Sequence, residues 1–141
     1  MTMITVRPYK SALDRLRAAR LRPTRQRLAL ARLLFEQGDR HLTAEDLHGE
    51  ALGADIQVSL ATVYNTLHQF TGAGLLREIT VDTGRSYFDT NISDHHHFFL
   101  VDEGRLLDIP GEGVVIEGLP EAPAGKRVDR VDVIVRVRED D

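Results

Sequence analysis

The stretch Ser59–Phe70, SLATVYNTLHQF, decides the fold. Ser59 is a favoured helix N-cap residue. The apolar residues that follow are spaced by three, four and three positions: Leu60, Val63, Leu67 and Phe70. This spacing predicts a helix with one buried face. The other residues predicted on its surface are Thr62, Asn65, Thr66, His68 and Gln69. Such side chains can reach base edges in the major groove, although an ordinary amphipathic surface helix would carry them too.

Three further helices are predicted before this stretch: from Tyr9 to Arg20, from Thr24 to near Gly38, and from Thr43 to near Gly53. The first and second are separated by Pro23, because the residue before a proline avoids the helical conformation. Thr24 and Thr43 suit the N-cap position. Asp46 stands three residues after Thr43, which resembles a capping box with Asp in place of Glu. The N-terminal part of the chain is therefore predicted to be a small helical module.

Two short runs, residues 75–81 and 85–89, surround a turn that contains Gly84. They predict a β-hairpin. Three helices followed by such a hairpin make a winged helix-turn-helix, here with one extra helix before it. We therefore expect a winged DNA-binding domain over residues 1–90.

The composition changes after residue 90. Residues 97–101 and 105–109 predict a second hairpin, and the alternating valines of Val131–Val137 predict a strand with one mostly polar face. The Gly- and Pro-rich residues 110–126 are predicted to be irregular. We expect residues 91–141 to form a second, small domain, so that the whole chain is of the α+β class.

The charge of the chain is unevenly distributed. The net charge is −4, yet residues 7–32 contain nine basic residues and one acidic residue. Residues 91–141 contain six basic and twelve acidic residues. A basic front on an acidic protein indicates a polyanionic partner for the front half, and a merely solvated helix face is the alternative.

The composition also excludes several classes of protein. The 141 residues include no cysteine, which excludes disulfides, thiolate nucleophiles and Cys-ligated zinc. No apolar run is long enough to span a membrane, and the first ten residues show no signal-peptide pattern. We therefore expect a cytoplasmic protein with no membrane partner.

Three consecutive histidines, His95, His96 and His97, stand before an apolar run. Imidazoles bind Zn, Fe, Mn and haem. In a strand, His95 and His97 would point to one face and could bind one metal, while His96 would point to the other. A structural or merely exposed cluster is the alternative.

Several motifs together resemble the ferric uptake regulator (Fur) family. They are Leu21–Arg27 (LRPTRQR), Leu42–Leu47 (LTAEDL) and Val58–Leu67 (VSLATVYNTL), which includes the Thr-Val-Tyr that is typical of the family's recognition helix. Tyr87–Asn91 (YFDTN), Asp94–His97 (DHHH) and the lack of zinc cysteines are most similar to the iron response regulator (Irr) branch. The likeness extends over nearly the whole chain.

The resemblance implies contacts with double-stranded DNA. Tyr64 would contact bases in the major groove, and Arg20 and Arg22 would approach a flanking minor groove or phosphates. The full predicted DNA-binding set is Arg20, Arg22, Ser59, Thr62, Tyr64, Asn65 and Arg85. The implied operators are A/T-rich palindromes near iron and haem genes.

The resemblance also implies a regulatory metal site. Its ligands would be His41, Asp89, His95 and His97, with Asp89 in place of the usual Glu. A second metal or haem site would use Asp94, His96, Glu112 and Glu117, but no histidine follows His97 to complete it. The family's structural zinc site is lost, because Leu100 and Glu103 stand where the cysteines would be.

These observations predict a homodimeric transcription regulator, not an enzyme, that responds to a divalent metal (Fe, Mn or Zn) or to haem. The second domain would be a small α/β dimerisation domain that pairs two subunits through Val131–Val137 and its neighbours. Two alternatives stay open. One is a metal-independent DNA-binding protein with structural histidines. The other is a zinc enzyme with His41, His95 and His97 as ligands.

Overall fold

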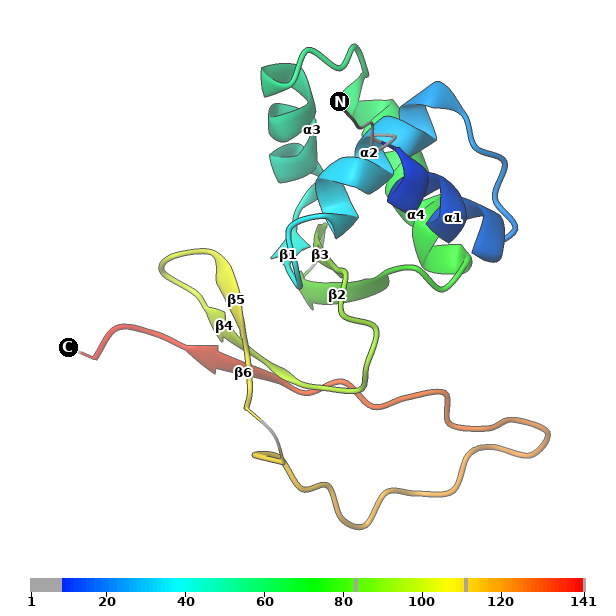
Figure 1. Ribbon diagram of the computed structural model, residues 1–141. Coiled ribbons are helices and arrows are strands. Elements are labelled where there is room, and N and C mark those ends of the chain that lie inside the picture. Colours follow the sequence, from blue (N-terminus) through cyan, green and yellow to red (C-terminus); the bar gives the residue numbers. More distant parts are fainter. Residues whose placement is uncertain (1–8, 83, 111, 141) are drawn as a thin grey trace. The chain divides into compact units, whose positions relative to one another are not determined.

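The computed structural model describes residues 9–82, 84–110 and 112–140. The chain divides into two compact units between Ile92 and Ser93. The first unit contains every helix of the described residues and a small sheet, and the second contains a separate sheet (Figure 1). The chain is therefore of the α+β class, with a winged helix-turn-helix module first.

The first unit has four helices and three strands. The helices are α1 (Lys10–Ala18), α2 (Arg25–Phe35), α3 (Ala44–Gly53) and α4 (Leu60–Gly72). The strands are β1 (His41–Leu42), β2 (Arg77–Asp82) and β3 (Arg85–Asp89), in the order β1-β3-β2. Strands β2 and β3 form the antiparallel wing, and Gly84 in its turn has a φ of +78°, a conformation that favours glycine.

The three predicted N-caps are confirmed. The hydroxyls of Thr24, Thr43 and Ser59 accept hydrogen bonds from the backbone N–H three residues later, at 3.2, 3.0 and 3.1 Å. In return, the backbone N–H of Thr43 donates to Asp46 Oδ2 at 3.1 Å, which completes the capping box. Helices α2, α3 and α4 therefore begin where local sequence chemistry places their starts.

The core of the first unit gathers around α4. Its fully buried side chains include Leu16, Leu30, Leu34, Leu47, Val63, Leu67, Phe70 and Phe88. The prediction that Thr66 lies on the outer surface is wrong, because its side chain is only 5% exposed. Thr66 follows Val63 by three residues and precedes Phe70 by four, so it lies on the same helix face. The buried face of α4 is thus wider than its apolar pattern indicates.

Strand β1 is not predicted from the sequence. It pairs antiparallel with β3, so that His41 lies opposite Asp89 and Leu42 opposite Phe88. A strand of two residues is too short to show the alternating pattern by which strands are predicted. This strand places the residues before α3 against the wing.

The second unit is built from β4 (His97–Leu100), β5 (Arg105–Asp108) and β6 (Ile134–Val137), in the order β5-β4-β6. Strands β4 and β5 form the predicted antiparallel hairpin, and β6 runs parallel to β4. Only the last four residues of the predicted strand Val131–Val137 form β6. The buried apolar side chains of the described part of the second unit are Phe99, Leu106 and Ile109.

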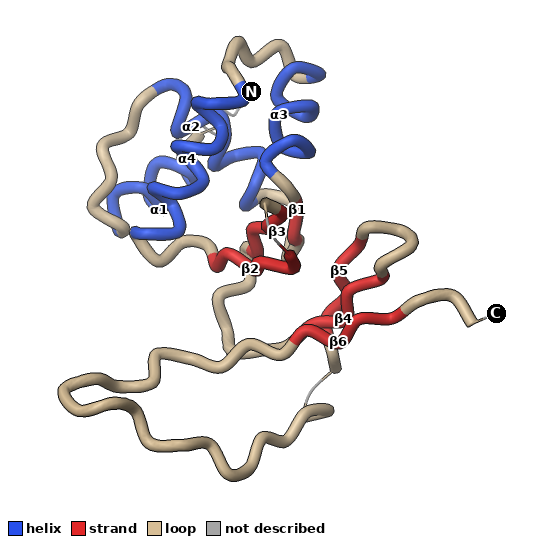
Figure 2. The backbone as a smooth tube through the Cα atoms, turned by 180° about the vertical axis from the view of Figure 1, so that it is seen from behind, coloured by secondary structure: helices blue, strands red, loops and turns tan. Residues whose placement is uncertain are grey.

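A long segment separates β5 from β6. The described residues 109, 110 and 112–133 contain neither helix nor strand, as Figure 2 shows in tan. Glycine and proline disfavour both regular structures, and the irregular conformation expected for residues 110–126 is observed at residues 110 and 112–126, whereas residue 111 lies outside the described residues. Within residues 93–110 and 112–140 the unit consists of strands and loops, without a helix.

Across the part of the chain that the structure describes, no helix combines the length and the apolar character that crossing a lipid bilayer requires.

Candidate functional site

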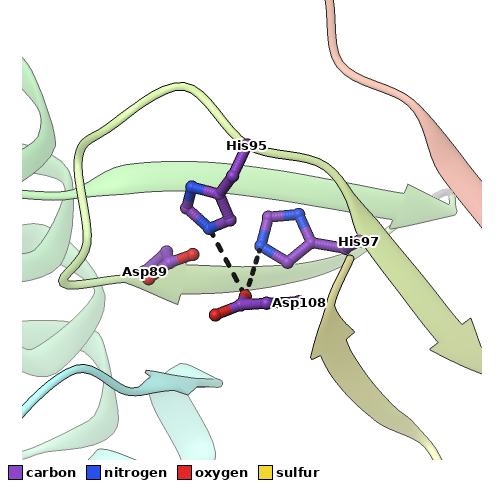
Figure 3. A group of neighbouring side chains, drawn as sticks. All are labelled: Asp89, His95, His97 and Asp108. Carbon is purple, nitrogen blue, oxygen red and sulfur yellow. Dashed lines mark ion pairs between the residues drawn. The ribbon is translucent and has the colours of Figure 1, made fainter. Parts of the chain in front are cut away.

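The second unit brings two histidines and one aspartate together where β4 begins and β5 ends. His97 lies directly opposite Asp108 in the antiparallel pair. The Nε2 atoms of His95 and His97 each lie 3.4 Å from Asp108 Oδ1, and the centres of the two rings are 4.5 Å apart (Figure 3). One ligand atom from each of the three side chains lies within 4.8 Å of the others.

The hydrogen bond of His95 fixes which of its ring nitrogens is available. Its Nδ1 is 2.7 Å from the carbonyl oxygen of Ser93, and a carbonyl oxygen only accepts hydrogen bonds. Nδ1 therefore carries a proton, and in the neutral ring Nε2 presents a lone pair toward Asp108. A carbonyl that orients a histidine through its second nitrogen is typical of metal-binding histidines.

The donor set of this cluster fits a divalent cation. Ring nitrogens and a carboxylate oxygen converge, and their lone pairs repel one another unless a proton or a cation lies among them. Imidazole and carboxylate ligands together suit Zn, Fe and Mn. The side chains of His95 and His97 are 11% and 2% exposed, whereas that of Asp108 is 49% exposed. The cluster is therefore largely shielded from water but reachable from the carboxylate side.

His96 points away from this cluster, as the alternation of a strand predicts. Its Nδ1 accepts a hydrogen bond from the backbone N–H of Val133 at 3.0 Å. The neighbouring His97 N–H donates to the carbonyl of the same residue at 3.2 Å. His96 therefore anchors the residues that lead into β6.

The other residues of the predicted second site do not gather around His96. Asp94, Glu112 and Glu117 are exposed, the two glutamates in the irregular segment after β5. Within the described part of the chain, these side chains and His96 form no group close enough to hold a metal ion.

His41 and Asp89 belong to the first unit. They are partners in the β1–β3 pair. Asp89, which is also labelled in Figure 3, is 1% exposed, and its Oδ1 accepts the backbone N–H of Asn91 at 2.9 Å. The wing thus ends in a buried carboxylate.

Asp108 is the site residue that sequence reasoning missed. It stands alone in a predicted strand and belongs to no motif. The signal that could have found it is the register of the predicted hairpin, because a strand pair closed by a short turn sets His97 opposite Asp108. Cross-strand partners share one face of the sheet.

Four residues of the predicted DNA-binding set, Ser59, Thr62, Tyr64 and Asn65, lie in α4 or at its N-cap. Asn65, His68 and Gln69 are exposed, and Thr62 and Tyr64 are half-buried. Ser59 Oγ donates to Thr62 Oγ1 at 3.0 Å, so these two hydroxyls at the start of the helix are hydrogen-bonded to each other. The exposed face of α4 is polar and carries no acidic side chain, which suits a helix that approaches the phosphates of DNA.

Tyr64 is held by α3. Its hydroxyl donates to the carboxylate of Glu45, at 3.1 Å from Oε2 and 3.3 Å from Oε1. Burial raises the pKa of the Tyr64 phenol, and the hydrogen bond to Glu45 and the negative charge of Glu45 raise it further. Tyr64 therefore keeps its proton across the physiological pH range.

A second polar link joins the loop before α2 to α4. Arg27 donates through Nη1 to the carbonyl of Arg22 and through Nη2 to Gln69 Oε1, both at 2.9 Å. In the same loop, Arg20 has a φ of +61°, in the left-handed region that non-glycine residues seldom adopt. Arg20 and Arg22 are both exposed. Arg85, at the wing tip, forms an ion pair with Asp82 at 3.1 Å.

Comparisons with known proteins found relatives of this chain and similar structures. The sequence profile of the ferric uptake regulator family matches residues 18–120. The chain is 32% identical over 100 residues to the ferric uptake regulation protein of Shigella flexneri, which covers 70% of this chain and 68% of that protein. It is 35% identical over 105 residues to the peroxide operon regulator of Bacillus subtilis, a match that covers 74% of this chain and 72% of that protein.

Among solved structures, the chain is similar to the ferric uptake regulator from Pseudomonas aeruginosa with manganese. The TM-score is 0.69 at 28% sequence identity, and the match covers 92% of this chain and 98% of that chain.

Proposed function

The chain belongs to the ferric uptake regulator family, and from this premise we propose that it is an iron- or haem-responsive transcription regulator of the Irr type. It binds double-stranded DNA as a homodimer, in the cytoplasm, and it is not an enzyme. The main support for a response to metal is that the side chains of His95 and His97 converge on Asp108, and that the carbonyl of Ser93 orients His95.

DNA is read by α4, which enters the major groove. Tyr64, Asn65, Ser59 and Thr62 approach base edges, and the wing residue Arg85 and the loop residues Arg20 and Arg22 approach phosphates or a minor groove. Support comes from the exposed polar face of α4 and from the exposed arginines Arg20 and Arg22 in the loop before α2. Two like subunits match a palindromic operator, for which we propose an A/T-rich sequence near iron and haem genes.

The regulatory ion is Fe, Mn or Zn, and His95, His97 and Asp108 would hold it in the second unit. We propose that Asp89 and His41 of the first unit complete the ligand set. Only five residues, 90–94, separate Asp89 from His95 in the chain. When bound, the cation would supply positive charge that stabilises these converging donors.

Regulation follows from the division of the ligands between two units. His41 and Asp89 move with the DNA-binding unit, whereas His95, His97 and Asp108 belong to the unit that pairs the subunits. Ligands shared in this way favour one spacing of the two DNA-binding units over others. A ligand regulates only when it prefers one such state.

Haem would be sensed through the same histidine cluster, since imidazole is a common ligand of haem iron. Haem and a divalent metal would then compete for His95 and His97. A second, separate metal or haem site around Asp94, His96, Glu112 and Glu117 is the weaker version of this proposal, because His96 already uses Nδ1 to bind the backbone of Val133.

A DNA-binding titration with Mn²⁺, Fe²⁺, Zn²⁺, haem and chelator in turn tests the proposal. The operator is first selected from a random pool of duplexes. We expect at least one of these ligands to change the operator dissociation constant, and Tyr64→Ala to weaken specific binding by roughly 1–3 kcal/mol.

Arg22→Ala serves as the contrasting variant. It should weaken binding to all duplexes about equally and lower the salt dependence, as expected for a phosphate contact. Specific binding that no metal, haem or chelator alters would instead establish a metal-independent regulator. Hydrolytic turnover without specific DNA binding would favour the zinc-enzyme alternative.

A further inference from the structure

The contact between Tyr64 and Glu45 joins the two helices of the helix-turn-helix. Glu45 lies in the first turn of α3, two residues after the cap Thr43, and Tyr64 lies in the second turn of α4. The hydroxyl of Tyr64 is within hydrogen-bond distance of both carboxylate oxygens, at 3.1 and 3.3 Å. Tyr64 is half-buried and Glu45 is exposed, so the contact lies at the surface that the recognition helix presents.

The chemistry of the two groups fixes the direction of this hydrogen bond. An ionised carboxylate is only an acceptor, whereas a tyrosine hydroxyl has one proton to donate and lone pairs that accept. The hydroxyl proton must therefore point to Glu45. The raised pKa of the Tyr64 phenol agrees, because Glu45 stabilises the protonated form.

We propose that Glu45 is a specificity-determining residue, which takes the hydroxyl proton of Tyr64 and so leaves that hydroxyl only as a hydrogen-bond acceptor toward DNA. This inference rests on the proposed DNA-binding function of α4. In the major groove, an acceptor can pair with the exocyclic amino group of adenine (N6) or cytosine (N4). It cannot pair with the O6 and N7 of guanine or the O4 of thymine, which are acceptors themselves.

Glu45 also disfavours guanine and thymine directly, by charge repulsion. Its negative charge lies beside the hydroxyl, so a guanine or thymine oxygen at this position would meet lone pairs and a nearby carboxylate. Polar groups buried without a partner weaken binding strongly. Specificity then comes from rejection of acceptor bases as well as from attraction of amino groups.

The fold does not depend on this contact. Helix α3 is held by its capping box and by buried Leu47 and Ala51, and α4 by Val63, Leu67 and Phe70. Loss of one hydrogen bond between partly exposed groups leaves these cores unchanged. Variants at Glu45 are therefore expected to fold, which far-ultraviolet circular dichroism can verify.

The test compares four proteins on a modified operator. The wild-type chain, Glu45→Ala, Tyr64→Phe and Glu121→Gln are titrated with the selected duplex, in which each adenine in turn is replaced by purine and each cytosine by a base that lacks the N4 amino group. Glu121 is an exposed carboxylate in the irregular segment after β5, so Glu121→Gln controls for the loss of one surface charge.

We expect one position at which removal of the amino group weakens wild-type and Glu121→Gln binding by roughly tenfold, the scale of a base contact. Tyr64→Phe should bind the unmodified duplex more weakly and show no further loss at that position. Glu45→Ala should lose the preference for the amino group there and tolerate thymine or guanine, because its Tyr64 hydroxyl can donate.

Two results would overturn the inference while leaving the proposed function in place. One is specific DNA binding in which no amino-group removal distinguishes wild type from Tyr64→Phe. The other is an unchanged base preference in Glu45→Ala. Absence of any specific duplex binding by the wild-type chain would be a different result, and would reject the proposed function itself.

Discussion

At the scale of single residues, neighbouring histidines have opposite environments. His97 faces Asp108 and is almost fully buried, whereas His96 turns to the backbone of Val133. An asparagine can keep a hydrogen-bond acceptor for the Val133 N–H, so asparagine variants separate metal binding from this structural bond better than alanine variants do.

We predict that His97→Asn loses most bound divalent metal and that His96→Asn keeps it. The reason is that His95 and His97 direct ring nitrogens to the shared Asp108 oxygen, whereas the Nδ1 of His96 accepts from the backbone of Val133. Metal content after gel filtration, measured by mass spectrometry, checks this. Equal loss in both variants would show that the face on which a histidine lies does not decide metal binding.

Tyr64 gives a prediction about pH. Its pKa in the folded protein is raised by burial and by the hydrogen bond and charge of Glu45. Because the phenol holds its proton more tightly in the folded protein, it contributes stability at pH values below the pKa of an unfolded tyrosine, which is about 10. This contribution is lost as the pH rises through the higher pKa of the folded protein. We therefore expect the Tyr64 phenol to ionise above pH ~10, and Glu45→Ala to bring its midpoint down.

The near-ultraviolet absorbance of tyrosinate, compared between each protein and its Tyr64→Phe counterpart, isolates this one phenol among the three tyrosines. An ionisation midpoint that Glu45→Ala leaves in place would contradict the assigned hydrogen bond.

At the scale of elements, the capping box of α3 sets both the start of that helix and the position of Glu45. Thr43 accepts the N–H of Asp46 and donates its own N–H to the Asp46 carboxylate. We predict that Thr43→Ala lowers the free energy of unfolding by about 1 kcal/mol, the usual effect of losing an N-cap.

Urea denaturation measures this difference, and Thr43→Ser is the matched control because serine keeps the capping hydroxyl. A Thr43→Ser variant as unstable as Thr43→Ala would assign the loss to the missing methyl group instead of the cap.

At the scale of the whole molecule, β6 is an edge strand with Val135 and Val137 37% and 36% exposed. An uncovered edge with apolar side chains is a site for pairing with another chain. We predict that the protein sediments as a dimer even after chelation, because this apolar surface is present without metal.

The variant Val135→Lys should weaken the dimer, because it places a charge on this apolar edge. A wild-type chain that sediments as a monomer at micromolar concentration would rule out this interface.

The sequence by itself determined the local features of this protein. Helix starts at Thr24, Thr43 and Ser59, both hairpins, and the opposite faces of His96 and His97 all follow from chemistry within a few residues. The resemblance to the family followed from short motifs of the same range. These predictions succeed because caps, turns and strand alternation depend on near neighbours in the chain.

Only the tertiary structure decided which distant groups meet. Asp108 joins the histidines through strand pairing, His96 bonds a backbone group 37 residues away, and Tyr64 meets a carboxylate 19 residues earlier. The burial of Thr66 and the short strand β1 likewise depend on what packs against them. The register of the predicted hairpin could have indicated Asp108, but local patterns carry no information on the other partners, because helix packing and long-range contacts are set by the fold as a whole.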